Sequence, residues 1–273
     1  MTECLCPLCS STRCELAETT EPPHRLVRCA DCSLVFVDPI PDSGELSRHY
    51  DQDYYAEWVS TQRDKRERMW SRRLKGIENK STGGDILDVG CGDGLFLELA
   101  KRNGWRVQGT DVSAYAAEFA SERLGHSVFC GEIWDAGFHA QSFDVVTLWH
   151  VLEHTTHPTR VLQEARKVLK AGGTLVLAVP NLNDHLMRLA YRLVKGRRLR
   201  RFSLRDKEIH LFHFSVNSIQ WLLEATGFEC RQIGPDFGIV ELAYRLVNWP
   251  AAALFYILGV HWYNSIQAVA SPK

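Results

Sequence analysis

A loop of alternate glycines between acidic residues has the residue types and spacing that ligand binding requires. Three glycines, Gly90, Gly92 and Gly94, follow Asp88 at every second position. Glycine has no Cβ atom, so such a loop can turn tightly and bring its backbone close to a ligand. Because Asp88 and Asp93 both lie beside the loop, it would repel a pyrophosphate. The pattern therefore favours a ligand that carries positive charge.

The elements around this loop predict an α/β unit. Residues 86–89 are an apolar run typical of a strand buried on both faces, and a helical pattern begins at Leu95. A second apolar strand ends at Asp111, 23 residues after Asp88. This order of strand, glycine loop, helix, strand and acid is typical of a nucleoside-binding domain. Alternating strands and helices continue to residue 180, which predicts a mainly parallel sheet.

Cysteines near the N-terminus are spaced for metal binding. Two Cys-x-x-Cys pairs are separated by 19 residues, a spacing typical of a zinc ribbon. The predicted ligands of this structural Zn²⁺ are Cys6, Cys9, Cys29 and Cys32. Four protein ligands leave no open position for catalysis. Cys4, Cys14 and His24 are alternative ligands, and buried free thiols are the alternative to a metal site. Six of the nine cysteines lie in the first 32 residues, which indicates metal binding rather than disulfides.

Histidines follow the fourth predicted strand, at the edge of a parallel sheet where ligands bind. His150 comes directly after that strand, and His154 lies one helical turn further along the chain. An imidazole at this place could accept a proton near neutral pH, so both are candidate catalytic residues. Alternatively, His154 and the neighbouring Glu153 orient the loop. His210 and His213 are interpreted as buried structural histidines.

Several segments of the chain carry the motifs of one enzyme superfamily. Besides the acidic glycine loop, they are 143–154, 169–175, 179–181 and 210–227. With these motifs the chain resembles the class I S-adenosylmethionine-dependent methyltransferases. The resemblance implies an α/β fold, a Rossmann-like, seven-stranded, mostly parallel sheet preceded by a small zinc ribbon. Its antiparallel last strand is predicted at 265–269, beside 229–233. The ribbon resembles that of bacterial members found in surface-glycan, sugar and secondary-metabolite pathways.

The resemblance also implies the cofactor, S-adenosyl-L-methionine, which carries a sulfonium, an ammonium and no phosphate. By this resemblance Asp88, Gly90 and Gly92 line the methionyl part, and Asp111 accepts hydrogen bonds from both ribose hydroxyls. The other residues predicted to line the cofactor are Glu132 and Ile133 near the adenine, together with Cys91, Val112 and Trp149. The enzyme's task would be to position a nucleophile and, for a hydroxyl, to supply a base.

The predicted domain plan has three parts. Residues 1–40 form the ribbon, 41–84 a linker and helix, and 85–273 the methyltransferase domain, with inserts at 185–209 and 236–263. A charged run over 63–68 is predicted to be the solvent-exposed face of the linker helix.

The two inserts have different compositions. Residues 188–207 hold nine Lys or Arg against one Asp, whereas 239–263 are rich in aromatic and aliphatic residues. Asn248 and Pro250 interrupt the apolar run, so we expect no membrane-spanning helix. A basic surface beside an apolar one suits peripheral contact with an anionic membrane or a lipid-linked acceptor. Alternatively, the apolar run completes the core or a dimer interface, and the arginines are solvated.

Composition and charge narrow the function further. The 273-residue chain is 45% hydrophobic, carries a net charge of −1 and opens without the features of a signal peptide. We expect a cytoplasmic protein, or one peripheral at the inner membrane face, with no nucleic-acid partner. The predicted function is methyl transfer to a small-molecule or glycan-type acceptor. A ribosomal RNA base methyltransferase and a non-catalytic binding module are the alternatives. The oligomeric state is left open.

Overall fold

The main element of the fold is a seven-stranded sheet. The structure is a computed structural model that describes residues 4–41, 63–78, 83–204, 206–238 and 242–273. The sheet has the strand order β10-β11-β8-β7-β4-β5-β6, and β11 runs antiparallel to both of its neighbours. Its strands are β4 (Gly84–Val89), β5 (Trp105–Asp111), β6 (Phe129–Cys130), β7 (Phe143–Trp149), β8 (Leu169–Pro180), β10 (Phe228–Pro235) and β11 (Ser265–Pro272). The predicted α/β sheet with an antiparallel last strand is confirmed.

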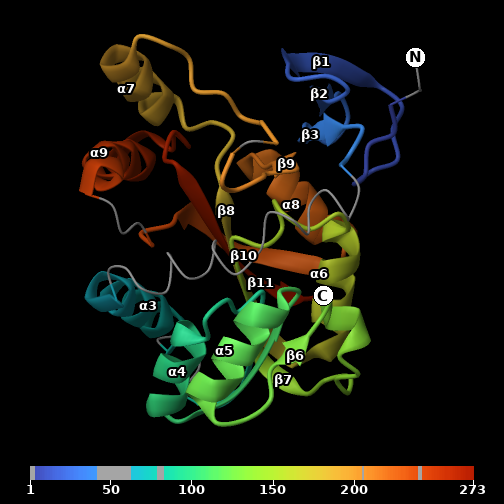
Figure 1. The fold of residues 1–273 in the computed structure, drawn as a ribbon, viewed down its shortest axis with the longest axis vertical. Coiled ribbons are helices and arrows are strands. Elements are labelled where there is room, and N and C mark those ends of the chain that lie inside the picture. The colour runs from blue at the N-terminus through green and yellow to red at the C-terminus, as the bar shows by residue number, and fades with distance from the viewer. Residues whose placement is uncertain (1–3, 42–62, 79–82, 205, 239–241) are drawn as a thin grey trace.

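Helices cover both faces of this sheet (Figure 1). One face packs against α3 (Arg63–Glu78), α4 (Leu95–Arg102) and α5 (Ala114–Leu124), and their apolar side chains share one core with inward residues of the strands. The other face packs against α6 (Pro158–Val168) and α8 (Val216–Ala225), around a second and larger core. A short 3₁₀ helix, η1 (Ile133–Asp135), follows β6. The strands are therefore buried on both faces, which is why they read as continuous apolar runs.

Local signals in the sequence set several helix ends. Ser113 accepts a hydrogen bond from the Ala116 N–H and caps α5, and Gly125 ends that helix in a left-handed conformation. Pro158 occupies the first turn of α6. Gly172 and Gly173, shortly after α6, are part of β8. The pairing of β8 with β7 shifts register there, so the glycines lie in an irregular strand rather than in a separate loop.

The ribbon forms a second sheet that includes a strand from the other end of the chain. Its strands are β1 (Cys14–Thr19), β2 (Arg25–Cys29), β3 (Val35–Asp38) and β9 (Phe212–His213), in that order. β3 pairs with β9 through Val35 opposite His213 and Phe36 opposite Phe212. The ribbon's apolar residues belong to the same core as α6 and α8. The ribbon is therefore packed into the second half of the fold, as Figure 1 shows.

Two further helices lie outside the sheet layers. α7 (His185–Lys195) and α9 (Leu242–Leu258) contact each other and lie at one side of the molecule in Figure 1. Pro250 lies inside α9, which continues through it. Within the described residues, no helix combines the length and apolar character needed to cross a membrane. The expectation that Asn248 and Pro250 interrupt this segment is wrong for the helix itself, because α9 includes both residues.

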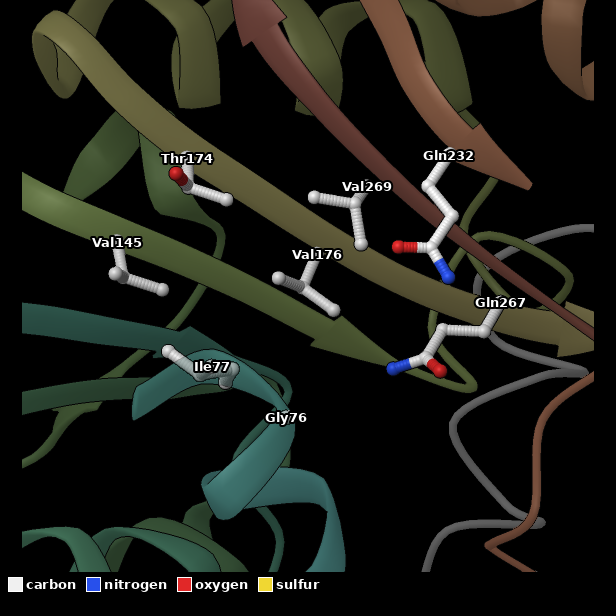
Figure 2. Close-up of a pocket in the computed structure, with 8 residues that line it drawn as sticks. All are labelled: Gly76, Ile77, Val145, Thr174, Val176, Gln232, Gln267 and Val269. Carbon is white, nitrogen blue, oxygen red and sulfur yellow. The ribbon is translucent and has the colours of Figure 1, made fainter. Parts of the chain in front are cut away.

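A small cavity of about 120 Å³ lies between the end of α3 and the sheet (Figure 2). Its lining residues are Gly76, Ile77, Val145, Thr174, Val176, Gln232, Gln267 and Val269. None of the residues predicted to bind the cofactor or to act in catalysis is among them. The cavity therefore belongs to the packing of α3 against the sheet and not to the predicted site.

Candidate functional site

The predicted site begins with Asp88 near the carboxyl end of β4. Its carboxylate is buried, with 2% of the residue exposed, and its Oδ1 accepts a hydrogen bond of 2.6 Å from the Thr147 hydroxyl. Burial raises the pKa of Asp88 well above its ordinary value, and the nearby charge of Asp111 adds to this effect. A positively charged ligand group would favour the ionised form of this carboxyl. The position thus suits the cationic ligand that the sequence predicts.

The carboxylate of Asp111 lies against the backbone of the glycine loop. Gly92 has φ of +55°, and its N–H donates to Asp111 Oδ2 at 2.8 Å, while the Ser113 N–H donates to Oδ1 at 2.9 Å. A Cβ atom at Gly92 would meet nothing within 4 Å, so this stretch of backbone has open space beside it. A Cβ at Gly94 would lie 2.9 Å from that of Ala120, which explains why α4 and α5 can pack so closely. Asp111 is therefore held at the ligand-binding edge of the sheet.

Asp93 has a different role from the one its sequence position suggested. Its carboxylate is 3% exposed and binds two arginines, Arg66 Nη2 at 2.6 Å and Arg123 Nη1 at 2.9 Å. Its charge is therefore matched inside the protein and does not face a ligand, so the prediction that it adds negative charge to the site is wrong. The predicted solvent-exposed face over 63–68 is wrong for Arg66, although Arg63, Asp64, Lys65 and Arg68 are exposed. Through these two ion pairs, Asp93 instead links α3 and α5 to the glycine loop.

The residues predicted near the adenine lie beside Asp111. The Gly131 N–H donates to the Asp111 carbonyl at 2.8 Å, which brings Glu132 next to the end of β5. Burial raises the pKa of Glu132, and Ile133 is fully buried. Val112 is 60% exposed. Cys91 is buried behind the loop.

An aromatic cluster closes the other side of the loop. Trp149 packs edge-on against Trp70 and Phe96, with ring centroids 5.8 and 5.6 Å apart. The guanidinium of Arg73 lies over Trp149, 4.5 Å from the ring centroid, and forms an ion pair with Asp236. Asp236 is 2% exposed at its side chain. Although burial opposes it, the charge of Arg73 holds the pKa of Asp236 below its ordinary value.

His150 lies at the centre of these charges. Its φ of +58° is rare for a residue with a side chain, and its N–H donates to the Ala178 carbonyl at 2.9 Å. The ring Nδ1 lies 3.2 Å from Glu153 Oε1, and Nε2 lies 3.8 Å from Asp236 Oδ2. Although burial opposes it, these two carboxylates raise the pKa of His150 to about 9. Arg73 Nη2 lies 3.3 Å from the same Nε2, and the role of His150 as a base stays a prediction.

His154, the second catalytic candidate, points toward a different group. Its Nδ1 lies 2.8 Å from the carbonyl oxygen of Ile209, and its ring centroid is 4.9 Å from that of His210. Burial and the neighbouring imidazole lower the pKa of His210 to about 4. His213 is buried, as predicted, and its Nε2 has no hydrogen-bond partner among the described residues. His210 is only partly buried. The loop that contains Ile209 thus brings His210 close to His154 and Glu153.

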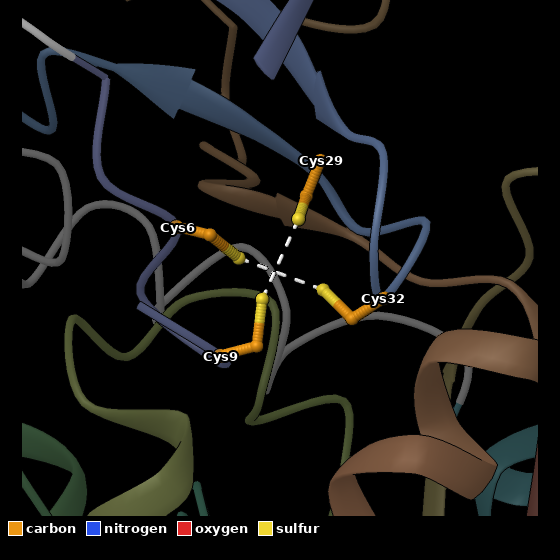
Figure 3. A group of neighbouring side chains, drawn as sticks. All are labelled: Cys6, Cys9, Cys29 and Cys32. Carbon is orange, nitrogen blue, oxygen red and sulfur yellow. Dashed lines mark hydrogen bonds between the residues drawn. The ribbon is translucent and has the colours of Figure 1, made fainter. Parts of the chain in front are cut away.

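The four predicted zinc ligands converge in the ribbon (Figure 3). Their sulfur atoms all lie within 4.8 Å of one another, and two Sγ–Sγ separations are 3.5 Å. Tetrahedral Zn²⁺ with Zn–S bonds of about 2.3 Å would place the sulfurs about 3.8 Å apart. The cluster therefore fits the geometry and chemistry of a zinc ribbon. It is made of Cys6, Cys9, Cys29 and Cys32.

The two Cys-x-x-Cys turns have the same backbone bonding. The N–H of Ser10 donates to the Cys6 carbonyl and that of Ser33 to the Cys29 carbonyl, at 2.9 and 3.1 Å. Ser10 and Ser33 both have positive φ, 57° and 61°. Each turn points its two thiols toward the other turn, so the two turns form matching halves of the cluster. Two matching turns of this kind are typical of a zinc ribbon.

The alternative ligands of the ribbon have other partners. Cys4 and Cys14 are joined by a disulfide. The expectation that the cysteines would form no disulfides is therefore wrong for this pair. His24 Nδ1 lies 2.7 Å from the Pro39 carbonyl oxygen, which gives that histidine a structural contact in the ribbon.

Sequence reasoning missed the residues that act across long chain separations. Arg73 and Asp236 are 163 positions apart, and no local pattern connects them. The only sequence signal was a helical run of arginines next to apolar residues in α3, in which Arg66 and Arg73 occur at helical spacing. Both face inward together with Met69, Trp70 and Leu74. Helical periodicity could therefore have placed these two arginines on the buried face.

Comparisons with known proteins agree with this architecture. A family model described as a methyltransferase domain matches residues 48–233. Ubiquinone biosynthesis O-methyltransferase of Coxiella burnetii is 35% identical over 118 residues, covering 41% of this chain and 50% of that protein. The chain thus spans about half the length of the curated relatives it matches.

Solved structures show the same fold at low sequence identity. An S-adenosylmethionine-dependent methyltransferase from Thermotoga maritima has a TM-score of 0.55 at 19% identity, covering 84% of this chain and 99% of that one. Another from Archaeoglobus fulgidus has a TM-score of 0.52 at 19% identity, covering 75% and 93%. The glycine loop, the sheet order and the matched family model agree. The chain belongs to the methyltransferase-domain family.

Proposed function

We propose that this chain is an S-adenosylmethionine-dependent methyltransferase. Its acceptor is a small amphipathic molecule, anionic or lipid-linked, and its α7–α9 side lies against a membrane surface. The single observation that carries the proposal is the location of the exposed apolar side chains. Ten of the thirteen large hydrophobic residues exposed in the described parts of the chain lie between positions 189 and 262. They are Leu189, Leu193, Val194, Phe237, Leu246, Trp249, Tyr256, Ile257, Leu258 and Trp262. A concentration of this kind marks a surface that binds something apolar.

Basic side chains accompany this apolar surface. No residue of α7 is buried, and Leu193 and Val194 are 77% and 79% exposed. The exposed basic residues in and after this helix are Arg192, Lys195, Arg197, Arg198 and Arg200. An exposed apolar face flanked by cations suits a membrane with anionic lipids, because burial of the face and attraction of the charges act together.

The surface adjoins the edge of the sheet that carries the candidate site. Asn181, directly after β8, donates hydrogen bonds from Nδ2 to the carbonyl oxygens of His261 and Tyr263, at 3.0 and 2.7 Å. His150 is bonded to the same strand through Ala178. An acceptor held partly in a membrane could therefore present its polar end near His150. The similarity to ubiquinone biosynthesis O-methyltransferases supports a small acceptor and an oxygen nucleophile.

Sedimentation with liposomes tests the membrane contact. Liposomes with 30% anionic lipid should bind the wild-type enzyme at low salt and release it at high salt. Charge reversal of Arg197, Arg198 and Arg200 together should weaken binding at least tenfold. Arg201 is excluded from this set because it contacts Glu18 at 3.3 Å. The matched control reverses Arg68 and Arg72, two exposed cations on α3.

A second pair of variants tests the apolar part of the same surface. Leu193→Asp should weaken liposome binding, whereas Leu16→Asp, at a residue that is 63% exposed on β1, should not. Transfer of a radiolabelled methyl group to lipid extracts, compared with water-soluble sugars, then separates the acceptor classes. Absence of binding at low salt, or a stable dimer that covers α7 and α9, would overturn the membrane contact.

We also propose that the ribbon holds one structural Zn²⁺. The convergence of four thiols in two matching turns supports this. Elemental analysis should find about one zinc per chain, and Cys29→Ser combined with Cys32→Ser should remove it. Cys130→Ser, at an exposed cysteine on β6, is the control. Full zinc content in the double variant would show that these thiols are not the ligands.

A further inference from the structure

A second cluster of metal-ligating side chains lies away from the ribbon and the glycine loop. Glu153, His154 and His210 each offer one ligand atom, and these atoms all lie within 4.8 Å of one another. Glu153 and His154 follow β7, whereas His210 comes from the loop before β9. The N–H of Leu211 donates to the Glu153 carbonyl at 2.7 Å, which fixes this loop beside the end of β7. Two distant segments are thus bonded together where the cluster forms.

One carboxylate oxygen of Glu153 is buried without a hydrogen-bond partner among the described residues. Its side chain is fully buried, and Oε1 lies 3.2 Å from His150 Nδ1. The other oxygen, Oε2, is buried with no hydrogen-bond partner among the described residues. A buried carboxylate oxygen without a partner costs free energy, and folded proteins contain few of them. A bound cation would supply the missing partner.

The bonding of His154 matches that of a metal ligand. Its Nδ1 lies 2.8 Å from the Ile209 carbonyl oxygen, which can only accept, so the proton is on Nδ1. The lone pair of this ring is therefore on Nε2. Metal-binding histidines commonly donate their second N–H to a backbone carbonyl in this manner, which fixes both the tautomer and the ring orientation. The His210 ring stands beside it, with centroids 4.9 Å apart and planes at 63°.

We propose that Glu153, His154 and His210 bind one divalent transition-metal ion. Two imidazoles and one carboxylate are a donor set that suits Zn²⁺, Mn²⁺, Fe²⁺ and Co²⁺, and that disfavours Ca²⁺ and Mg²⁺. Three protein ligands leave at least one coordination position open. This position lies on the same sheet edge as His150, so an oxygen of the acceptor could occupy it. That last assignment rests on the proposed function, whereas the metal site itself does not.

Direct metal binding tests the site without acceptor or membrane. The enzyme is first given one equivalent of Zn²⁺ to fill the ribbon and is then titrated with Mn²⁺, followed by the decrease of the free-ion electron paramagnetic resonance signal. We expect one Mn²⁺ per chain beyond the zinc. Glu153→Gln and His210→Asn should each weaken Mn²⁺ binding at least tenfold, and the exposed His139→Asn is the matched control.

Two variants are used because a change at buried Glu153 can disturb the fold, whereas His210 is only partly buried. Circular dichroism and S-adenosylmethionine affinity identify any variant that has lost its structure. The proposal fails if folded wild-type enzyme takes up no Mn²⁺ and no Co²⁺ beyond the ribbon at millimolar concentration. It also fails if His210→Asn binds as well as wild type. Membrane binding can fail while this site is intact, so the two proposals are tested separately.

Discussion

Substitution of Asp93 by asparagine distinguishes a structural role of this acid from a cofactor-binding role. Asp93 Oδ1 and Oδ2 bind Arg66 and Arg123 at 2.6 and 2.9 Å, and the side chains are 3%, 5% and 12% exposed. Breaking a buried ion pair by removing one partner costs about 3–5 kcal/mol. Arg123 keeps a second contact with Glu98, at 3.6 Å, which reduces the loss. We therefore expect Asp93→Asn to lower the free energy of unfolding by about 2–4 kcal/mol.

The assay compares stability with affinity in the same variant. A loss of this size should lower Tm by about 5–15 °C in a protein of this length, measured by calorimetry. Affinity for S-adenosylmethionine at a temperature where the variant is folded should change by less than about threefold, since one such factor is about 0.6 kcal/mol. Glu122→Gln, an exposed acid on α5, is the control and should change neither quantity.

The opposite pattern would refute this reasoning. An unchanged Tm together with an affinity loss of more than about tenfold would mean that Asp93 faces the cationic cofactor. Such a result would restore the interpretation of the sequence alone, which the two buried ion pairs of Asp93 contradict.

Two further substitutions test the cofactor site and a buried acid. Asp111→Asn should weaken S-adenosylmethionine binding by about 1.5–3 kcal/mol, or about 10- to 150-fold by titration calorimetry, because a charge-assisted bond to the ribose is lost; equal affinity in a folded variant would contradict this. Burial raises the pKa of Asp184 to about 7, so the folded state holds its proton more tightly than the unfolded state and stability falls as pH rises from about 4 to 7. Asp184→Asn should therefore be more stable than wild type at pH 8, by about 1–2 kcal/mol after allowance for solvent access, with the difference shrinking toward pH 4. A pH-independent difference in urea denaturation would rule out this explanation.

The sequence predicted those parts of the fold that depend on neighbouring residues. Asp88, the glycine loop and Asp111 belong to one continuous segment, and the helix signals at Ser113, Gly125 and Pro158 act within a turn of their own position. The four ribbon cysteines were equally predictable, because two short spacings determine the geometry of the turns.

Contacts between distant segments were not predictable in this manner. The bond between Arg73 and Asp236 and the pairing of β3 with β9 depend on how the chain returns on itself, which leaves no periodic signal. The same holds for His210, which the sequence suggested as a structural residue and the fold brings beside Glu153. Such residues become apparent only when burial and unpartnered atoms are considered together.

The strand shared between the ribbon and the second half of the domain couples two events at a distance. Val35 and Phe36 of β3 pair with His213 and Phe212, and the Val37 N–H donates to the Leu211 carbonyl at 3.0 Å. Any ion that binds the four thiolates restricts β3 and, through it, the segment that presents His210. By thermodynamic linkage, an ordered segment must in turn tighten the hold on that ion. If the ribbon holds Zn²⁺ as proposed, the supply of zinc would then set the fraction of chains in which the segment with His210 is ordered.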